Sequence, residues 1–179
     1  MSTNRVLVIG LDGVPPDLLR PWIEAGELPT MAHLVRQGAS GTLRSTMPPT
    51  SGPSWSSFMT GKNPGKTGIY DFLHRAQGSY HFPPVNASLR DGLDLWQILS
   101  QAGRRVGVLN VPLTYPIRPV NGFMISGWMT PYSAKDYVYP PELDAELRQA
   151  VGDYRIYPTM TCSPGREREY LAASLCGVG

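Results

Sequence analysis

Three short apolar runs constrain the fold of this chain more than any other feature. Residues 5–11 read Arg-Val-Leu-Val-Ile-Gly-Leu, and comparable runs occupy residues 105–111 and 122–128. Runs of this length, bounded by Gly, Pro or Asp, are typical of strands that are buried on both faces, as in parallel sheets. The sequence therefore predicts a sheet that is covered on both sides.

Helices are expected around these strands, because proline and glycine mark their starts and ends. Residues 41–46 are a further candidate strand, whereas residues 61–88 contain too much Gly and Pro to be assigned. The alternation of expected strands and helices along the chain predicts an α/β fold, with a mostly parallel sheet and helices on both faces. We expect residues 1–179 to build this fold as a single domain. The expected helices span residues 17–25, 29–37, 54–60, 93–101, 140–151 and 166–175.

Composition excludes several classes of protein. The chain has 179 residues, a net charge of +2 and two cysteines, which are too few for a disulfide framework. Its basic residues form no cluster, so we expect no nucleic-acid partner. Its apolar stretches are too short for a signal peptide or a membrane span, so we expect a cytoplasmic protein without a membrane partner. The 19 glycines and 18 prolines predict long ordered loops, which often carry function.

Asp12 follows the first apolar run directly and precedes Gly13. Open α/β sheets bind ligands at the carboxyl ends of their strands, so a carboxylate here can bind a metal ion or act as a general base. The alternative is structural, with Asp12 capping the next helix. The sequence leaves both interpretations open.

Ser51 lies in a loop between Pro48-Pro49 and Gly52-Pro53, just before an expected helix. The N-terminus of a helix presents N–H groups and a positive partial charge, which suit a phosphate. A serine hydroxyl is a weak nucleophile that needs a base or a metal ion, and Asp12 could hold that metal ion. The alternative is a surface loop in which Ser54 is the N-cap of the helix.

The motifs resemble a known family. Leu7-Val-Ile-Gly-Leu-Asp12-Gly13 is similar to the first metal-ligand strand of the alkaline phosphatase superfamily. Pro48-Pro-Thr-Ser51-Gly-Pro53 and the later pair Thr60-Gly61 resemble the nucleophile loop of its type I phosphodiesterase/nucleotide pyrophosphatase branch. In the family, the nucleophile of that loop is Thr or Ser, and it is followed by any residue and then by Pro. A Thr-Gly pair ends ten residues after the nucleophile. Residues 64–69, 110–116 and 120–127 extend the resemblance, which covers about residues 5–131.

The resemblance implies an alkaline-phosphatase-like fold and hydrolysis of phosphate esters or nucleotides with two divalent metal ions. Zn²⁺ is the expected metal and Mn²⁺ the alternative, because carboxylate and imidazole ligands suit either. By this analogy, Asp12 and Ser51 bind one metal ion, and Ser51 attacks phosphorus to form a phosphoserine intermediate. Ser54 is a candidate substrate contact.

The expected ligand set is incomplete. The family's remaining Asp and His ligands come from a second half, and this sequence contains only His33, His74 and His81. A catalytic metal site normally has at least three protein ligands. We therefore expect a domain that is incomplete at its C-terminal end, and a truncated chain that is inactive or poorly active unless a second chain completes the site. The alternative is a non-catalytic fragment that acts at most as a binding or interaction module.

Two further motifs compete with this interpretation. Gly61-Lys-Asn-Pro-Gly-Lys-Thr67 is one residue short of a P-loop, so a nucleotide-binding module around Gly61–Thr67 is another alternative. A P-loop follows a buried strand, however, whereas this segment follows an expected helix. Cys162-Ser-Pro-Gly-Arg166 spells the sulfatase nucleophile pattern, but Ser51 already occupies that register. We interpret the cysteine motif as a coincidence.

Overall fold

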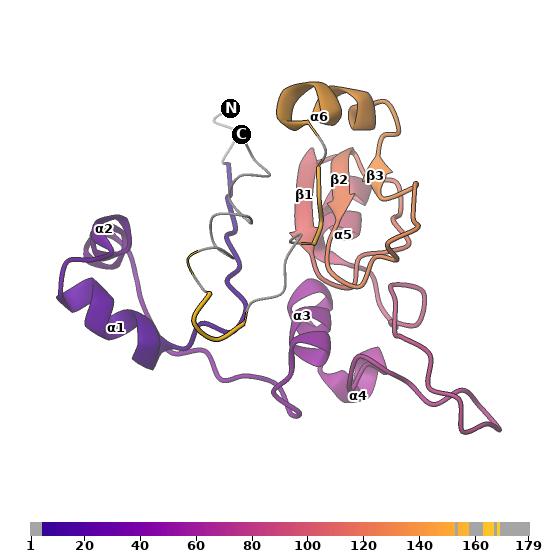
Figure 1. The fold of residues 1–179 in the computed structure, drawn as a ribbon, viewed down its shortest axis with the longest axis horizontal. Coiled ribbons are helices and arrows are strands. Elements are labelled where there is room, and N and C mark those ends of the chain that lie inside the picture. The colour runs from indigo at the N-terminus through magenta and orange to yellow at the C-terminus, as the bar shows by residue number, and fades with distance from the viewer. Residues whose placement is uncertain (1–4, 153, 158–162, 167, 169–179) are drawn as a thin grey trace. The chain divides into compact units, whose positions relative to one another are not determined.

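The computed structural model describes residues 5–152, 154–157, 163–166 and 168, and it divides the chain into two units (Figure 1). The first unit runs to Ser45 and the second begins at Thr46. Most of the expected helix over residues 166–175 lies outside the described residues, as does Cys162. The single-domain organisation stays a prediction, and each unit is described by itself.

The first unit contains two helices, α1 (Pro16–Glu24) and α2 (Pro29–Gln37). Both have proline in their first turn, where its missing N–H breaks no helical hydrogen bond. The bounds agree with the expected helices to within one residue. Neither helix has a buried residue, although each carries apolar side chains on one side. These helices therefore do not form a closed core within the described part of their unit.

The expected strand over residues 5–11 is absent from the structure, which assigns no strand there. Val6, Leu7 and Ile9 are 86%, 84% and 74% exposed. The prediction of a buried strand at this position is therefore wrong. An apolar run can form a strand only where a neighbouring strand supplies hydrogen bonds and a covering layer removes its side chains from water. The candidate strand over residues 41–46 is likewise unassigned.

The second unit contains a three-stranded mixed sheet in the order β1–β2–β3. β1 (Val106–Val111) runs parallel to β2 (Gly122–Ser126), which pairs in antiparallel fashion with the short β3 (Val138–Tyr139). The register places Val108 opposite Met124. The strands expected at residues 105–111 and 122–128 are confirmed. A mostly parallel sheet is not confirmed, since one pairing is parallel and the other antiparallel.

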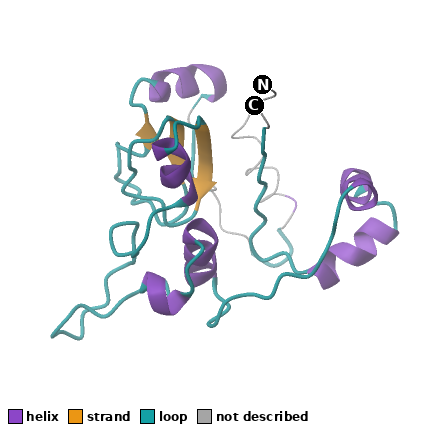
Figure 2. Ribbon diagram, turned by 180° about the vertical axis from the view of Figure 1, so that it is seen from behind, coloured by secondary structure: helices purple, strands orange, loops and turns teal. Residues whose placement is uncertain are grey.

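Four helices in the described part of this unit accompany the sheet. In Figure 2, α5 lies in front of the strands, and it contacts β1, whereas α6 contacts β3. Coverage of both faces by helices is not confirmed. Within the described ranges, the helices are too short or too polar to cross a membrane. The four are α3 (Ser51–Thr60), α4 (Pro64–Thr67), α5 (Leu95–Gln101) and α6 (Leu143–Val151).

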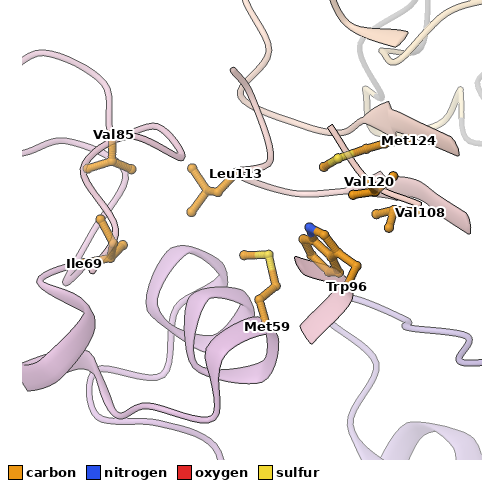
Figure 3. Packing of buried hydrophobic residues seen from close by; sticks show 8 residues of the cluster. All are labelled: Met59, Ile69, Val85, Trp96, Val108, Leu113, Val120 and Met124. Atoms are coloured by element: carbon orange, nitrogen blue, oxygen red, sulfur yellow. The ribbon is translucent and has the colours of Figure 1, made fainter. Parts of the chain in front are cut away.

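A hydrophobic core joins α3, α5 and the sheet (Figure 3). Met59 of α3 and Trp96 of α5 belong to the same buried cluster as Val108 of β1 and Met124 of β2. This packing fixes α3, and with it the chain that enters the helix at Ser51. The full cluster is Met59, Ile69, Val85, Trp96, Val108, Leu113, Val120 and Met124.

A buried ion pair lies beside this core. The Arg90 guanidinium donates from Nε and Nη2 to Oδ1 of Asp94 at 3.0 and 2.6 Å, and from Nη1 to the Leu113 carbonyl at 2.8 Å. Asp94 also precedes α5, where its backbone N–H donates to the side chain of Gln97 at 3.0 Å. The pair therefore ties the start of α5 to the loop that follows β1.

Candidate functional site

Ser51 is the first residue of α3. Thr50 is the N-cap, with extended backbone (φ −110°, ψ 159°), and its side chain makes no capping hydrogen bond. The first helical bond runs from the Ser54 N–H to the Thr50 carbonyl at 3.1 Å, and Pro53 before it has no N–H to donate. The N–H groups of the first turn precede this bond and take no part in the helix's own i→i−4 hydrogen bonds. A helix terminus of this kind can bind an anion, and it carries a hydroxyl at its first position.

Gly52 explains how a second segment approaches this terminus. A Cβ atom at Gly52 would lie 3.3 Å from the backbone oxygen of Asp71 and 3.5 Å from Cδ1 of Phe72. The glycine therefore allows the backbone at Asp71 to pack directly on the first turn of α3. The exposed Asp71 carboxylate accepts a hydrogen bond from the Phe72 N–H at 2.7 Å. Residues 71–72 thus lie against Gly52, the residue that follows Ser51.

Ser54 ties the preceding loop to α3. Its hydroxyl lies 2.9 Å from the Thr46 hydroxyl, which donates to the Pro48 carbonyl at 2.8 Å. Because Thr46 has only one hydroxyl proton, Ser54 is the donor between the two side chains. The N-cap alternative for Ser54 is wrong, because Thr50 holds that position. A substrate contact by Ser54 stays a prediction.

Asp12 lies in a turn of the first unit, where it is exposed and followed by Gly13 at φ 67°. The helix-cap alternative is wrong, since Pro15 is the N-cap of α1. Asp12 and Ser51 belong to different units. Their binding of a common metal ion therefore stays a prediction.

The described residues do not fit a complete metal centre. No group of three or more His, Cys, Asp or Glu side chains in this part of the chain is arranged to bind a metal ion. His33 lies in α2, and His74 and His81 lie in the loop after α4. Asp12 and Ser51 would need additional ligands, so the described residues alone do not make the two-metal site that the resemblance implies.

Residues 61–67 do not form a P-loop. Gly61 ends α3 in a left-handed conformation (φ 66°), and α4 follows. The N–H groups of Lys66 and Thr67 donate to the Asn63 carbonyl at 2.9 and 3.0 Å, and Lys66 also donates to the Asn63 side chain at 3.0 Å. N–H groups that would bind phosphate in a P-loop are thus used inside this turn. The geometry does not support the nucleotide-binding alternative.

The loops at the carboxyl ends of β1 and β2 have unusual backbone conformations. Asn110, Leu113 and Met129 have positive φ angles of 54°, 59° and 76°. A Cβ atom at Gly127 would lie 2.3 Å from the Asn110 carbonyl oxygen, so the two loops touch through their backbones. Strained non-glycine residues cluster at functional sites. Both stretches belong to the resemblance in the sequence, which implies no role for Asn110.

An aromatic pair links these loops to α3. Phe72, which contacts Gly52, packs edge-on against Trp128 with ring centroids 4.7 Å apart. The Trp128 carbonyl accepts a hydrogen bond from the Leu113 N–H at 2.9 Å. A continuous set of contacts therefore runs from the first turn of α3 to the loops after β1 and β2. No sequence motif marked Phe72 as part of this site.

A hollow of about 450 Å³ lies elsewhere in the second unit. Its lining includes Arg105, Gly122 and Glu142, which places it at the amino ends of β1 and β2. Ligands of open α/β sheets bind at the opposite, carboxyl ends. We therefore locate the candidate site at the first turn of α3 and the carboxyl-end loops rather than in this hollow.

Comparison with known proteins identifies the family. A family model described as type I phosphodiesterase/nucleotide pyrophosphatase matches residues 6–169. Neither the curated proteins nor the solved structures include a match to this chain. The family match covers Asp12, Ser51 and both carboxyl-end loops, the same segments that carry the resemblance in the sequence. The chain therefore belongs to the type I phosphodiesterase/nucleotide pyrophosphatase family.

Proposed function

We propose that this chain acts on phosphoric esters, with Ser51 as the nucleophile. Membership of the family supplies the reaction class, a hydrolase of the phosphodiesterase/pyrophosphatase type. The observation that carries the proposal is the position of Ser51 at the start of α3, ahead of the first helical hydrogen bond. The expected substrate is a small phosphate ester or nucleotide, in a cytoplasmic setting.

The first turn of α3 supports attack at phosphorus. A phosphate bound there would accept a hydrogen bond from the Gly52 N–H and would lie at the positive end of the helix dipole. Attack by Ser51 Oγ forms an O–P bond, breaks the P–O bond to the alcohol and releases the hydroxyl proton to solvent. Donors aimed at the phosphate oxygens stabilise the charge that moves onto them during this step.

The proposal includes a requirement for divalent metal, with Zn²⁺ ahead of Mn²⁺. A serine hydroxyl needs activation, and the described residues offer no three-ligand group for a metal ion. We propose Asp12 and Ser51 as two of the ligands, with a second chain supplying the others. We therefore expect the chain alone to be a slow catalyst.

A second function follows from the same observation. If no further ligands reach Ser51, the first turn of α3 can still bind a phosphate ester without hydrolysing it, because anion binding at a helix N-terminus needs no metal ion. The chain would then serve as a binding module for phosphate esters.

Hydrolysis of bis(4-nitrophenyl) phosphate with added Zn²⁺ or Mn²⁺ tests the proposal. Ser51→Ala is compared with Ser57→Ala, which removes a hydroxyl from the same helix outside its first turn. We expect metal-dependent release of nitrophenolate that Ser51→Ala abolishes and Ser57→Ala retains. Undiminished hydrolysis by Ser51→Ala would contradict the nucleophile assignment. Binding of phosphate without turnover would select the second function.

A further inference from the structure

Asn110 combines three features that place an exposed polar side chain beside the candidate site. It is exposed, it has a left-handed backbone (φ 54°), and it lies at the bulge between Leu109 and Val111, one residue before β1 ends at the edge of the sheet where open α/β folds bind ligands. The close approach of Gly127 accounts for the backbone contact at this point. It places no demand on the Asn110 side chain, which glycine could replace at this φ.

Tyr154 fixes the orientation of the Asn110 amide. The Tyr154 hydroxyl donates to Oδ1 of Asn110 at 2.5 Å, across 44 residues of sequence. With Oδ1 occupied as the acceptor, the amide nitrogen Nδ2 and its two N–H donors are directed away from Tyr154. Among the described residues, the structure gives Nδ2 no acceptor. An exposed pair of N–H donors is therefore held in one orientation.

The protonation state of Tyr154 supports this assignment. Burial raises the pKa of the Tyr154 hydroxyl, although the hydrogen bond with Asn110 opposes that rise. The hydroxyl therefore keeps its proton at neutral pH and has a hydrogen to donate to Oδ1 of Asn110.

Contacts already described connect Asn110 with the first turn of α3. Gly127 packs on the Asn110 carbonyl, and its neighbour Trp128 packs on Phe72, which in turn contacts Gly52. The Trp128 side chain is partly exposed, so it can form a wall between the two ends of this path. A ligand whose phosphate lies at the helix terminus would extend along Trp128 toward the Asn110 amide.

We propose that Asn110 is a specificity-determining residue that donates hydrogen bonds from Nδ2 to an acceptor oxygen or nitrogen on the leaving group of the ester. Tyr154 is the positioning residue for that amide. The proposal rests on the proposed function, which places the phosphate at Ser51. It favours esters of polyhydroxylated or heterocyclic alcohols over esters whose leaving group has no hydrogen-bond acceptor.

Calorimetric titration of the full chain with inorganic phosphate, ribose 5-phosphate and adenosine 5′-monophosphate tests this inference. Asn110→Asp keeps the size of the side chain and an acceptor for Tyr154 but removes both N–H donors. Asn110→Gly removes the side chain and suits the positive φ, so it guards against misfolding. Inorganic phosphate is the reference, because a new negative charge at residue 110 would weaken all three ligands.

We expect the wild-type chain to bind at least one ester more tightly than inorganic phosphate. Both Asn110 variants should reduce the ratio of ester affinity to phosphate affinity about 3- to 10-fold, the effect expected from the loss of one or two hydrogen bonds. Tyr154→Phe should reduce it less. Two results would overturn the inference while Ser51-dependent hydrolysis still stood. The ratio of ester affinity to phosphate affinity could be unchanged in both Asn110 variants, or the wild-type chain could bind the esters no more tightly than phosphate. A chain that binds none of the three ligands would contradict the proposed function as well.

Discussion

Residues 6–11 and 106–111 are both short runs rich in valine and leucine, yet they have different structures. In the second run, β1 pairs with β2, and Val108 lies in the core with 5% of its surface exposed. In the first run no strand is assigned, and Leu7 is 84% exposed. The second run has a strand beside it and α5 against it, whereas the described part of the first unit provides neither.

An apolar run specifies a preference for burial but does not by itself specify a strand. Its side chains favour burial by about 25 cal/mol per Å² of apolar surface, wherever that burial is available. The hydrogen-bonding partner and the covering helix come from distant parts of the chain. The same pattern therefore gives a strand in the second unit and an exposed segment in the first.

The largest expected effect contrasts the same kind of substitution in the two runs. Val108→Asp places a carboxylate in the core and should lower the free energy of unfolding of the second unit by more than about 3 kcal/mol, because the charge has no partner there. Ile9→Asp, at a side chain that is 74% exposed, should change the free energy of unfolding of the protein by less than about 0.5 kcal/mol. Urea unfolding followed by circular dichroism measures both. Equal losses would mean that residues 6–11 are buried as β1 is.

The next effect concerns the buried ion pair of the second unit. Asp94→Ala leaves the Arg90 guanidinium buried without its carboxylate and should destabilise the protein by about 3–5 kcal/mol. Asp144→Ala breaks the exposed pair with Arg148, whose N–O distance is 2.9 Å, and should cost less than about 1 kcal/mol. Comparison of the two unfolding midpoints checks the difference. A similar small cost for both would show that water reaches the Arg90–Asp94 pair.

A smaller effect is expected at the glycines. Gly127→Ala puts a methyl group 2.3 Å from the Asn110 carbonyl oxygen, so the two carboxyl-end loops must separate, at a cost of about 1–3 kcal/mol. Gly41→Ala in the first unit meets no atom within 4 Å and should be nearly neutral. Thermal unfolding distinguishes them. A neutral Gly127→Ala would contradict the close contact between the loops.

The smallest effect has the opposite sign. The Ser56 hydroxyl is fully buried and has no hydrogen-bond partner among the described residues. Ser56→Ala should therefore raise the free energy of unfolding by about 1 kcal/mol, because it removes an unsatisfied polar group. Ser54→Ala, which removes the hydrogen bond to Thr46, should lower it by a similar amount. A loss of stability in Ser56→Ala would indicate an acceptor for that hydroxyl.

Local sequence signals were enough to predict most elements of the second unit. The strands at residues 106–111 and 122–126 and the helix α5 lie within two residues of their expected bounds. α3 begins three residues before the predicted start, because Gly52-Pro53 lies in the first turn of the helix and does not end a loop. Proline is tolerated in a first turn, and this shift places Ser51 inside the helix.

Features that depend on tertiary contacts could not be predicted in this way. The exposure of residues 6–11 reflects missing neighbours, which no local pattern encodes. The contact of Phe72 with Trp128 and the hydrogen bond from Tyr154 to Asn110 join segments far apart in sequence. Ser51 was found because a motif carries it, whereas Asn110 is a single polar residue at the end of a strand. Its left-handed backbone is visible only in three dimensions.

Covalent trapping on Ser51 tests the central claim most directly, because it needs only one turnover and so detects even a slow catalyst. The chain is incubated with bis(4-nitrophenyl) phosphate and Zn²⁺ or Mn²⁺, quenched in acid and mapped by peptide mass spectrometry. Our account predicts a nitrophenyl phosphoryl or phosphoryl group on Ser51 that is absent from Ser51→Ala. The same modification in both proteins, or nitrophenolate release with residue 51 unmodified, would contradict it.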